Sequence, residues 1–234
     1  EAASATGPER PADRTVPLGN FKPHPATYPG QLTSDNVIQR GRGVFAGSSQ
    51  PDGVPNVWTM QCCTGNGTQG LYYAWESIVR CHNDLAEVNL LLNRASRWLD
   101  VDSYLPYEGR VVVRNKTARR LALRMPRWVS RGEVAVHTGG RPAEAAWVGN
   151  YLVCQGLQAG SEVVVEFPVV EESVAYTLSG KVYKCRFRGN DLVEISPHLP
   201  GPGYYPIYVD RSMADGRARM ETVSRYVTDT VLPW

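Results

Sequence analysis

Two adjacent cysteines, Cys62 and Cys63, are the residues of this 234-residue chain whose types and spacing most directly suggest chemistry. A turn rich in glycine, asparagine and threonine follows them and leads into an apolar, aromatic segment. Thiols at the start of a helix feel the positive end of its dipole, which favours the thiolate over the thiol. A thiolate attacks carbon or binds a soft metal ion, so this pair is the first candidate for a site.

The segment after the pair has the spacing of a helix with one apolar face. Its apolar positions fall at i, i+4, i+7 and i+8, namely Leu71, Trp75, Ile78 and Val79. Either Thr64 or Asn66 is expected to be the N-cap, because its side chain can accept a hydrogen bond from an amide of the first turn. The sequence therefore predicts a helix that begins directly after Cys62 and Cys63 and ends near Arg80.

Three interpretations of Cys62 and Cys63 fit their spacing. Free cysteines are often buried, so the pair can be part of a core without any chemical role. The two thiols can instead form a metal-binding or nucleophilic site, or close a strained disulfide between neighbours under oxidising conditions. Spacing alone leaves these alternatives open.

Beyond residue 80 the pattern changes from helical spacing to alternation with a period of two. Strand-like runs occur at 88–92, 111–113, 118–125, 134–136, 151–154 and 162–167, with a later hairpin from 182–187 to 191–195 through Gly189 and Asn190. Turn residues separate them at short, regular intervals, which is typical of a β-sandwich. An amphipathic stretch at 218–231 is expected to end the chain.

Three long runs of the sequence resemble the bacterial β-L-arabinofuranosidase family, glycoside hydrolase family 127, formerly a domain of unknown function. They are MQCCTGNGTQGLYYAWESI at 60–78, VNLLLNRASRWLDVDSYLPYEGRVVVRNKTARRLALRMPRWV at 88–129 and FRGNDLVEISPHLPGPGYYPIYVDR at 187–211. The resemblance extends over most of the chain from about Thr33 to Trp234. It implies a fold in which an (α/α)6 barrel is followed by β-sandwich domains.

The resemblance also implies an activity and a set of site residues. Members of the family hydrolyse terminal β-L-arabinofuranosides with retention, using a cysteine nucleophile bound to zinc. Cys62 aligns with that nucleophile and zinc ligand, and Cys63 aligns with the second zinc ligand of the pair. The implied partner is an arabinose-containing glycan or glycoside.

Part of the family's site has no counterpart in this sequence. The family's zinc also takes a glutamate and a cysteine from an upstream Glu-x-Cys motif, and another glutamate is the general acid/base. The sequence has no Glu-x-Cys, and Glu1 and Glu9 are the only glutamates before Cys62. We therefore expect a truncated or divergent C-terminal part of such an enzyme. Turnover by this chain would require either ligands from a partner chain or a rearranged site.

The alternative function is a non-catalytic carbohydrate-binding or structural β-sandwich module, or a subunit of a larger assembly. Six tryptophans and twelve tyrosines favour sugar stacking, although the same residues also fill sandwich cores. Helices remaining from a barrel would expose an apolar face, which predicts a homo- or hetero-oligomer.

The expected fold is mainly β, with β-sandwich domains preceded by a few helices that resemble the end of an (α/α)6 barrel. We predict an extended leader at 1–31, a remnant of the helical barrel carrying the cysteine pair at 32–85, and the β-sandwich region at 86–234. The net charge of +2, without a long basic run, argues against a nucleic-acid partner. The sequence also lacks an apolar run of the ~18 residues that a membrane span needs.

Other polar residues are given a structural interpretation. Cys81, Cys154 and Cys185 are expected to be core or half-buried thiols, and Cys81 with His82 has no further ligand at a usual spacing. Carboxylates also occur close together in the sequence, at Asp100, Asp102 and Glu108. Glycosidases commonly use carboxylate pairs. In a strand-and-turn segment, however, solvated carboxylates or a calcium-like surface site are equally expected.

Overall fold

The structure is a computed structural model that describes residues 3–6, 10–11, 45, 53–55, 61–197, 204–206 and 220–227. The chain divides into two compact units. Unit 1 comprises Glu1–Asp13, Tyr73–Val170 and Asp215–Trp234, and unit 2 comprises Arg14–Tyr72 and Glu171–Ala214. Within the described part of the chain, no helix combines the length and the apolar character that a membrane span requires.

Unit 1 contains two large β-sheets. The six-stranded sheet has the order β11-β10-β14-β8-β7-β6, with bounds Arg141–Pro142, Ala135–Thr138, Glu162–Glu166, Arg110–Asn115, Leu99–Ser103 and Arg94–Ala95. The five-stranded sheet has the order β12-β13-β9-β5-β4, with bounds Ala146–Val148, Tyr151–Gln155, Arg120–Arg124, Leu85–Val88 and Val79–His82. All neighbours pair antiparallel except β5 and β9, which are parallel.

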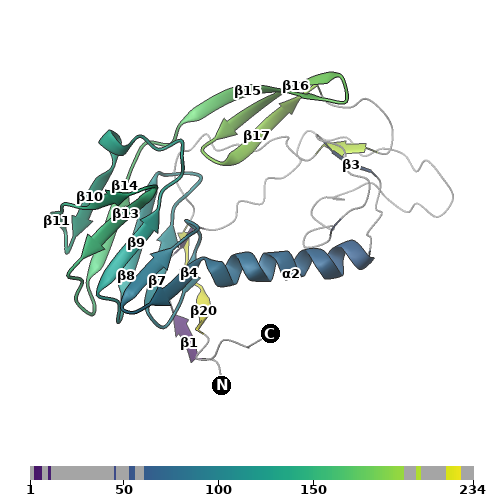
Figure 1. Cartoon of the computed structure of the whole chain (residues 1–234). Helices are drawn as coiled ribbons and strands as arrows, with labels where there is room; N and C mark the ends of the chain where they lie inside the picture. Colours follow the sequence, from purple (N-terminus) through teal and green to yellow (C-terminus); the bar gives the residue numbers. More distant parts are fainter. Residues whose placement is uncertain are drawn as a thin grey trace. The chain divides into compact units, whose positions relative to one another are not determined.

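The two sheets enclose one hydrophobic core (Figure 1). Alternate residues of β8 and β14 point inward from one sheet, and alternate residues of β9 and β13 point inward from the other. Those with at most 2% exposure are Val111, Val113, Val163, Val165, Leu121, Leu123 and Leu152. Each buried side chain of this size contributes about 1.5–3 kcal/mol relative to exposure. Two inner faces that share one core form a β-sandwich, as the sequence predicts.

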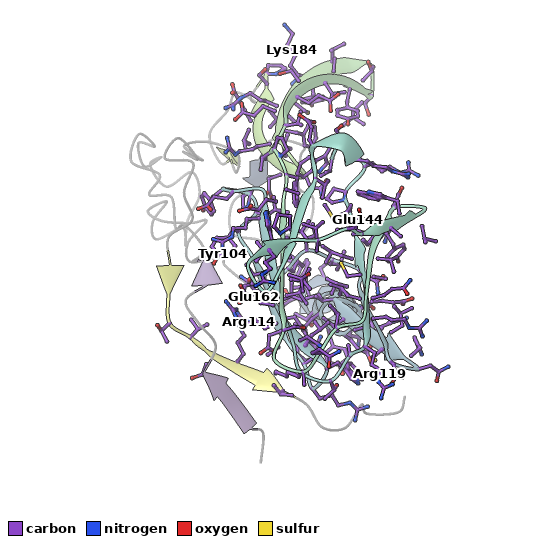
Figure 2. All side chains as sticks on the ribbon, turned by 90° about the vertical axis from the view of Figure 1, so that its left-hand side faces the viewer. Tyr104, Arg114, Arg119, Glu144, Glu162 and Lys184 are labelled. Atoms are coloured by element: carbon purple, nitrogen blue, oxygen red, sulfur yellow. The ribbon has the colours of Figure 1, made fainter. Side chains whose placement is uncertain are left out.

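The outward side chains of the two sheets point in opposite directions. Figure 2 shows Tyr104 and Arg114 on one flank of the sandwich and Arg119 toward the opposite flank. The alternation predicted at 118–125 is confirmed in part: Leu121, Leu123 and Met125 are buried and Arg120 and Arg124 are exposed, but Ala122 of the outward set is buried as well, and β9 itself is shorter than this range. The period-two pattern therefore sets which side chains reach the core and which reach water.

Unit 2 contains a separate antiparallel sheet of three strands, β15 (Glu171–Leu178), β16 (Lys181–Arg188) and β17 (Asp191–Ser196). The predicted hairpin through Gly189 and Asn190 is confirmed as β16–β17, and β15 adds a strand that the sequence pattern did not indicate. A small cluster of Tyr183, Cys185 and Ile195 is buried on this sheet.

Short strand pairs involve the chain termini and the region before the helix. They are β1 (Ala3–Thr6) with β20 (Ser224–Val227), β2 (Arg10–Pro11) with β19 (Met220–Glu221), and β3 (Gly53–Pro55) with β18 (Tyr204–Pro206). The predicted amphipathic end of the chain thus contributes strands β19 and β20. The division of the chain predicted at residues 31 and 85 stays a prediction.

Helix α2 spans Gln61–Ser77, so it begins and ends earlier than predicted. The N-cap prediction of Thr64 or Asn66 is wrong, because both residues lie inside the helix. The Thr64 hydroxyl instead accepts a hydrogen bond from the amide of Phe45 at 3.2 Å. Of the predicted apolar stripe, Ile78 and Val79 are buried just beyond the helix, whereas Leu71 is 61% exposed.

The C-terminal turn of α2 is held by side chains of the sandwich. Arg94, which is 7% exposed, donates from Nη1 to the carbonyl oxygen of Trp75, and its guanidinium lies 3.4 Å from the Trp75 ring centroid. The Asn89 amide donates to the carbonyl oxygen of Ser77 at 3.3 Å. The last carbonyls of a helix have no partner within it, so these contacts supply the missing donors and place a cation at the negative end of the dipole.

The expected strand at 88–92 is only partly correct. Strand β5 ends at Val88, and the amide of Asn89 donates to the carbonyl oxygen of Ile78 at 2.9 Å. Leu91 is buried and Leu92 is 52% exposed in the irregular segment that follows. Leu91 therefore packs in the hydrophobic core, although the residues after Val88 do not continue the strand.

Candidate functional site

The predicted site residues Cys62 and Cys63 are the second and third residues of helix α2. Cys62 is exposed and Cys63 is half-buried, and both are free thiols. The first turn carries no acidic residue. The pair therefore lies where the unpaired amides and the dipole of the helix favour negative charge, and Cys62 is open to a reagent or ligand.

The two thiols influence each other's ionisation. The pKa of Cys63 lies above its ordinary value, first because its side chain hydrogen-bonds to Cys62, and then because of burial and of charge on Cys62. Loss of a proton from one thiol of the pair thus makes loss of a proton from the other less favourable. A bound cation would remove this repulsion.

A disulfide between these neighbours would depart from the usual geometry of such bonds in any trans backbone. Consecutive Cα atoms of a trans peptide lie about 3.8 Å apart, whereas disulfides usually need about 4.4–6.8 Å. Both thiols are free in this structure. Of the three interpretations of the pair, this short separation disfavours the disulfide.

Phe45 was not identified from the sequence, yet it contacts the helix close to the cysteine pair. Its amide donates to Thr64, and a Cβ added at Gly67 would lie 2.7 Å from its ring. Gly67 is four residues after Cys63 and so shares its helix face. The glycine therefore allows the half-buried Phe45 ring to pack against this face, one turn from Cys63.

The thiol pair has the donor chemistry of a zinc site but supplies only half of a tetrahedral ligand set. Thiolate sulfur is a preferred ligand of zinc, and structural and catalytic sites take three or four protein ligands. Among the described residues, no three His, Cys, Asp or Glu side chains gather closely enough to hold a metal ion. Cys62 and Cys63 thus have the donor chemistry for this ion, and the described residues bring no further ligands close enough to complete a site.

The remaining cysteines are structural, as expected. Burial raises the pKa of Cys154 and Cys185, and it is also the largest cause of the raised pKa of Cys81, followed by the charge of Asp84. Cys81 and His82 are adjacent on β4, so their side chains point to opposite faces of the sheet. They do not form a joint metal site.

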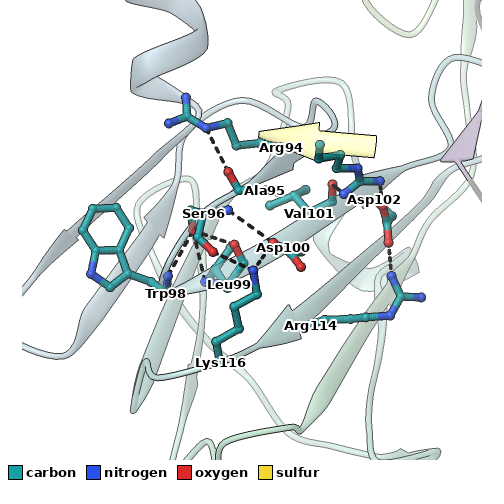
Figure 3. A network of polar contacts seen from close by, with 11 residues as sticks. Arg94, Ala95, Ser96, Trp98, Leu99, Asp100, Val101, Asp102, Arg114 and Lys116 are labelled. Carbon is teal, nitrogen blue, oxygen red and sulfur yellow. Dashed lines mark hydrogen bonds and ion pairs between the residues drawn. The ribbon is translucent and has the colours of Figure 1, made fainter. Parts of the chain in front are cut away.

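The carboxylates of β7 are neither solvated nor arranged as a calcium-like site, which corrects the sequence-based expectation for Asp102. Its side chain is 1% exposed, and its two oxygens accept hydrogen bonds from Arg114 and Arg225 (Figure 3). Asp100 accepts from Lys116 Nζ at 2.7 Å and from the amide of Ser96 at 3.2 Å. These carboxylates connect strands and are not poised for acid/base work.

Thiol reactivity gives a direct check of the coupling between Cys62 and Cys63. In Cys62→Ala, the pKa of Cys63 should fall toward its ordinary value, because the side-chain hydrogen bond that is the main cause of its elevation is removed. Iodoacetamide should therefore modify Cys63 faster at about pH 8 than in the wild type, since the thiolate is the reacting form. Peptide mass spectrometry measures the rate, and Cys81→Ser is the control that should leave it unchanged. An equal or slower rate in Cys62→Ala would contradict the coupling.

Comparisons with known proteins find partial similarity to solved structures. No protein-family model matches the sequence, and no curated protein matches it. The chain is similar in structure to glycoside hydrolases of the family that its sequence resembles. A GH127 β-L-arabinofuranosidase from Geobacillus stearothermophilus T6 matches with a TM-score of 0.47 and 18% identity, over 62% of this chain and 25% of that chain.

Two further solved structures give similar values. A GH127 β-arabinofuranosidase matches with a TM-score of 0.46 and 18% identity, over 56% of this chain and 25% of the other. A protein described as a glycoside hydrolase matches with a TM-score of 0.47 and 17% identity, over 73% of this chain and 28% of the other. The chain thus spans about a quarter of the length of the solved proteins it matches.

Proposed function

We propose that this chain carries the nucleophile of a zinc-dependent, retaining glycoside hydrolase that acts on β-L-arabinofuranosides. The observation that carries the proposal is the position of the exposed Cys62 thiol beside Cys63 in the first turn of α2. The long collinear runs that resemble the β-L-arabinofuranosidase family supply the reaction class. Cys62 is assigned as nucleophile and zinc ligand, and Cys63 as zinc ligand.

In the proposed reaction, the Cys62 thiolate attacks the anomeric carbon of a terminal arabinofuranoside. A carbon–sulfur bond forms while the bond to the leaving oxygen breaks, and that oxygen takes a proton from a carboxylic acid. Water then displaces sulfur from the same carbon, giving up its proton to the carboxylate and restoring the thiolate. Two displacements at one carbon retain its configuration.

The chain's own residues prepare the thiolate in this proposal. The N-terminus of α2 favours a negative charge on Cys62, and zinc bound by Cys62 and Cys63 supplies the positive charge that keeps a coordinating thiol deprotonated. The Phe45 ring, which packs near Gly67, adds apolar surface on the helix face that carries Cys63. The proton-donating glutamate and the remaining zinc ligands have no counterparts at matching positions of this sequence.

The assignment of Cys62 can be tested without the missing acid. An aryl leaving group needs little protonation, so 4-nitrophenyl β-L-arabinofuranoside, supplied with zinc, should leave a pentosyl adduct on Cys62. Intact-mass and peptide mass spectrometry would locate it. Cys62→Ser should abolish the adduct, whereas Cys81→Ser should retain it. An adduct on another residue, or none on Cys62, would refute the assignment of the nucleophile.

A further inference from the structure

The outer faces of the two sandwich sheets differ in whether their cationic side chains form ion pairs. On the six-stranded sheet, outward cations are paired with carboxylates: Arg110 with Glu166 at 3.8 Å, Arg114 with Glu162 at 3.3 Å, and Lys116 with Asp100 at 2.7 Å. On the five-stranded sheet, Arg80, Arg120 and Arg124 point outward and are exposed. None of these three forms an ion pair with a carboxylate of the described residues.

Strand register places these three arginines on one face. Arg120 and Arg124 are four residues apart on β9, which corresponds to about 13 Å along the strand. Arg80 of β4 is opposite Glu87 of β5, which is level with Ala122, midway between the other two arginines. Two strand spacings, about 10 Å, separate Arg80 from β9. We call Arg80, Arg120 and Arg124 the arginine face.

The hydrogen bonds that these arginines do make leave their charge uncompensated. Arg80 donates to the Ser77 hydroxyl at 3.1 Å, and Arg120 donates to the carbonyl oxygen of Asn83 at 3.0 Å. Glu87 is the carboxylate on this face, and Asp84 borders it in the β4–β5 turn. Arg119 and Arg127 flank β9 and are also exposed. The face as a whole is therefore cationic.

A fixed aromatic ring borders the same face. Tyr151 of β13 is opposite Arg124 of β9, and its hydroxyl donates to Asn89 Oδ1 at 2.8 Å. Since Asn89 follows β5, on the other side of β9, the tyrosine reaches across that strand. Asn89 is itself held by its bond to the Ser77 carbonyl. The half-buried ring is thus ordered, and such rings offer flat apolar surface to a sugar.

We propose that the arginine face binds a carboxylate-bearing glycan, with Arg120 and Arg124 contacting its uronate groups and Tyr151 contacting a sugar ring. Guanidinium groups bind carboxylates through two parallel hydrogen bonds, which neutral sugars cannot reproduce. Single-stranded nucleic acid instead needs successive aromatic rings for its bases, and the face provides one. That the ligand is a glycan rests on the proposed function, whereas the preference for a ligand that carries carboxylates rests on the three arginines.

Binding of polygalacturonate, compared with a neutral galactan of similar length, tests this assignment. We expect the wild-type chain to bind polygalacturonate more tightly, with an affinity that falls from about 50 to about 200 mM salt. The double charge reversal R120E/R124E should weaken binding about tenfold or more. The control R141E/K184E makes the same change in net charge at exposed positions outside the face, and it should stay within about twofold of the wild type. Circular dichroism checks that each variant is folded.

Several results would overturn the proposal. They are equal affinity for the neutral galactan, an equal loss in R141E/K184E, or equally tight binding of an oligouridylate of matched charge. Cys62→Ser should keep full affinity for polygalacturonate, because no step of this binding uses the thiol. A wild-type chain that binds polygalacturonate as expected but forms no adduct on Cys62 would refute the proposed hydrolase chemistry alone. A wild-type chain that forms the adduct on Cys62 but does not prefer polygalacturonate to the neutral galactan would refute the arginine face alone.

Discussion

Asp102→Ala is expected to lower the free energy of unfolding by about 3–5 kcal/mol, because it leaves a buried guanidinium without its counter-charge. Arg225 is 6% exposed, and its Nη1 also donates to the carbonyl oxygen of Val101 at 3.2 Å. Burial lowers the pKa of this guanidinium, while the charge of Asp100 acts in the opposite direction. Its Nε is buried without a partner among the described residues, so the carboxylate of Asp102 is its main compensation.

A matched control removes a carboxylate that contacts Arg114, the other arginine paired with Asp102, from the solvent side. Glu162 pairs with Arg114 and its side chain is 44% exposed, so Glu162→Ala should cost at most about 1 kcal/mol. The double variant Asp102→Leu/Arg225→Met should recover most of the loss, because replacing both partners by apolar groups removes the unpaired charge. Urea unfolding measures all three. Equal costs for Asp102→Ala and Glu162→Ala would contradict the buried network.

Gly109→Ala is expected to be the most damaging change of a single methyl group in the sandwich. A Cβ at this position would lie 1.7 Å from the backbone carbonyl oxygen of Phe167, and the Phe167 amide donates to the Gly109 carbonyl at 2.8 Å. Because the obstacle is backbone, a side-chain rotation cannot relieve it. Separating the two segments would break this hydrogen bond and disturb Phe167, whose ring contacts Trp128 edge-on with centroids 5.8 Å apart.

We expect Gly109→Ala to cost about 3 kcal/mol or more, at the upper end of overpacking effects. Gly132→Ala is the control, since a Cβ there meets nothing within 4 Å. It should change stability by less than about 0.5 kcal/mol. The urea midpoints of both variants measure the difference in stability. If Gly109→Ala folds poorly, its lower yield of soluble protein shows the same effect. Similar midpoints for the two variants would rule out the close approach.

The sandwich strands were predictable because the residues that favour them lie within each short segment of the sequence. Residues 111–113 and 162–167 are rich in β-branched side chains, and turn residues bound them. Exposure alternates with a period of two along 162–167, whereas 111–113 are buried throughout. A helix in this region was also predictable, although it contains the cysteine pair, and the apolar residues Ile78 and Val79 of the predicted stripe lie beyond its end. Its start was misplaced because Thr64 has good capping chemistry, yet its hydroxyl is used by Phe45, a residue far away in the sequence.

Long-range contacts explain what the sequence did not reveal. Asp102 and Arg225 are 123 residues apart, and no local pattern distinguishes a carboxylate that will be buried by a distant strand from a solvated one. The requirement for glycine at 109 arises from the backbone of residue 167, and the arginine face arises from the pairing of β4, β5 and β9. The cysteine pair was identified from type and spacing, and its position in the first turn of α2 required the structure.

Zinc binding by Cys62 and Cys63 is the claim on which the proposed function depends most directly. Elemental analysis of the purified chain, after dialysis against zinc and removal of the excess, should find about one zinc per chain in the wild type. The content should be lost in Cys62→Ser/Cys63→Ser and retained in Cys81→Ser. A wild-type chain without zinc, or a double variant that keeps it, would contradict the assignment of these thiols as a metal-bound nucleophile and its neighbouring ligand.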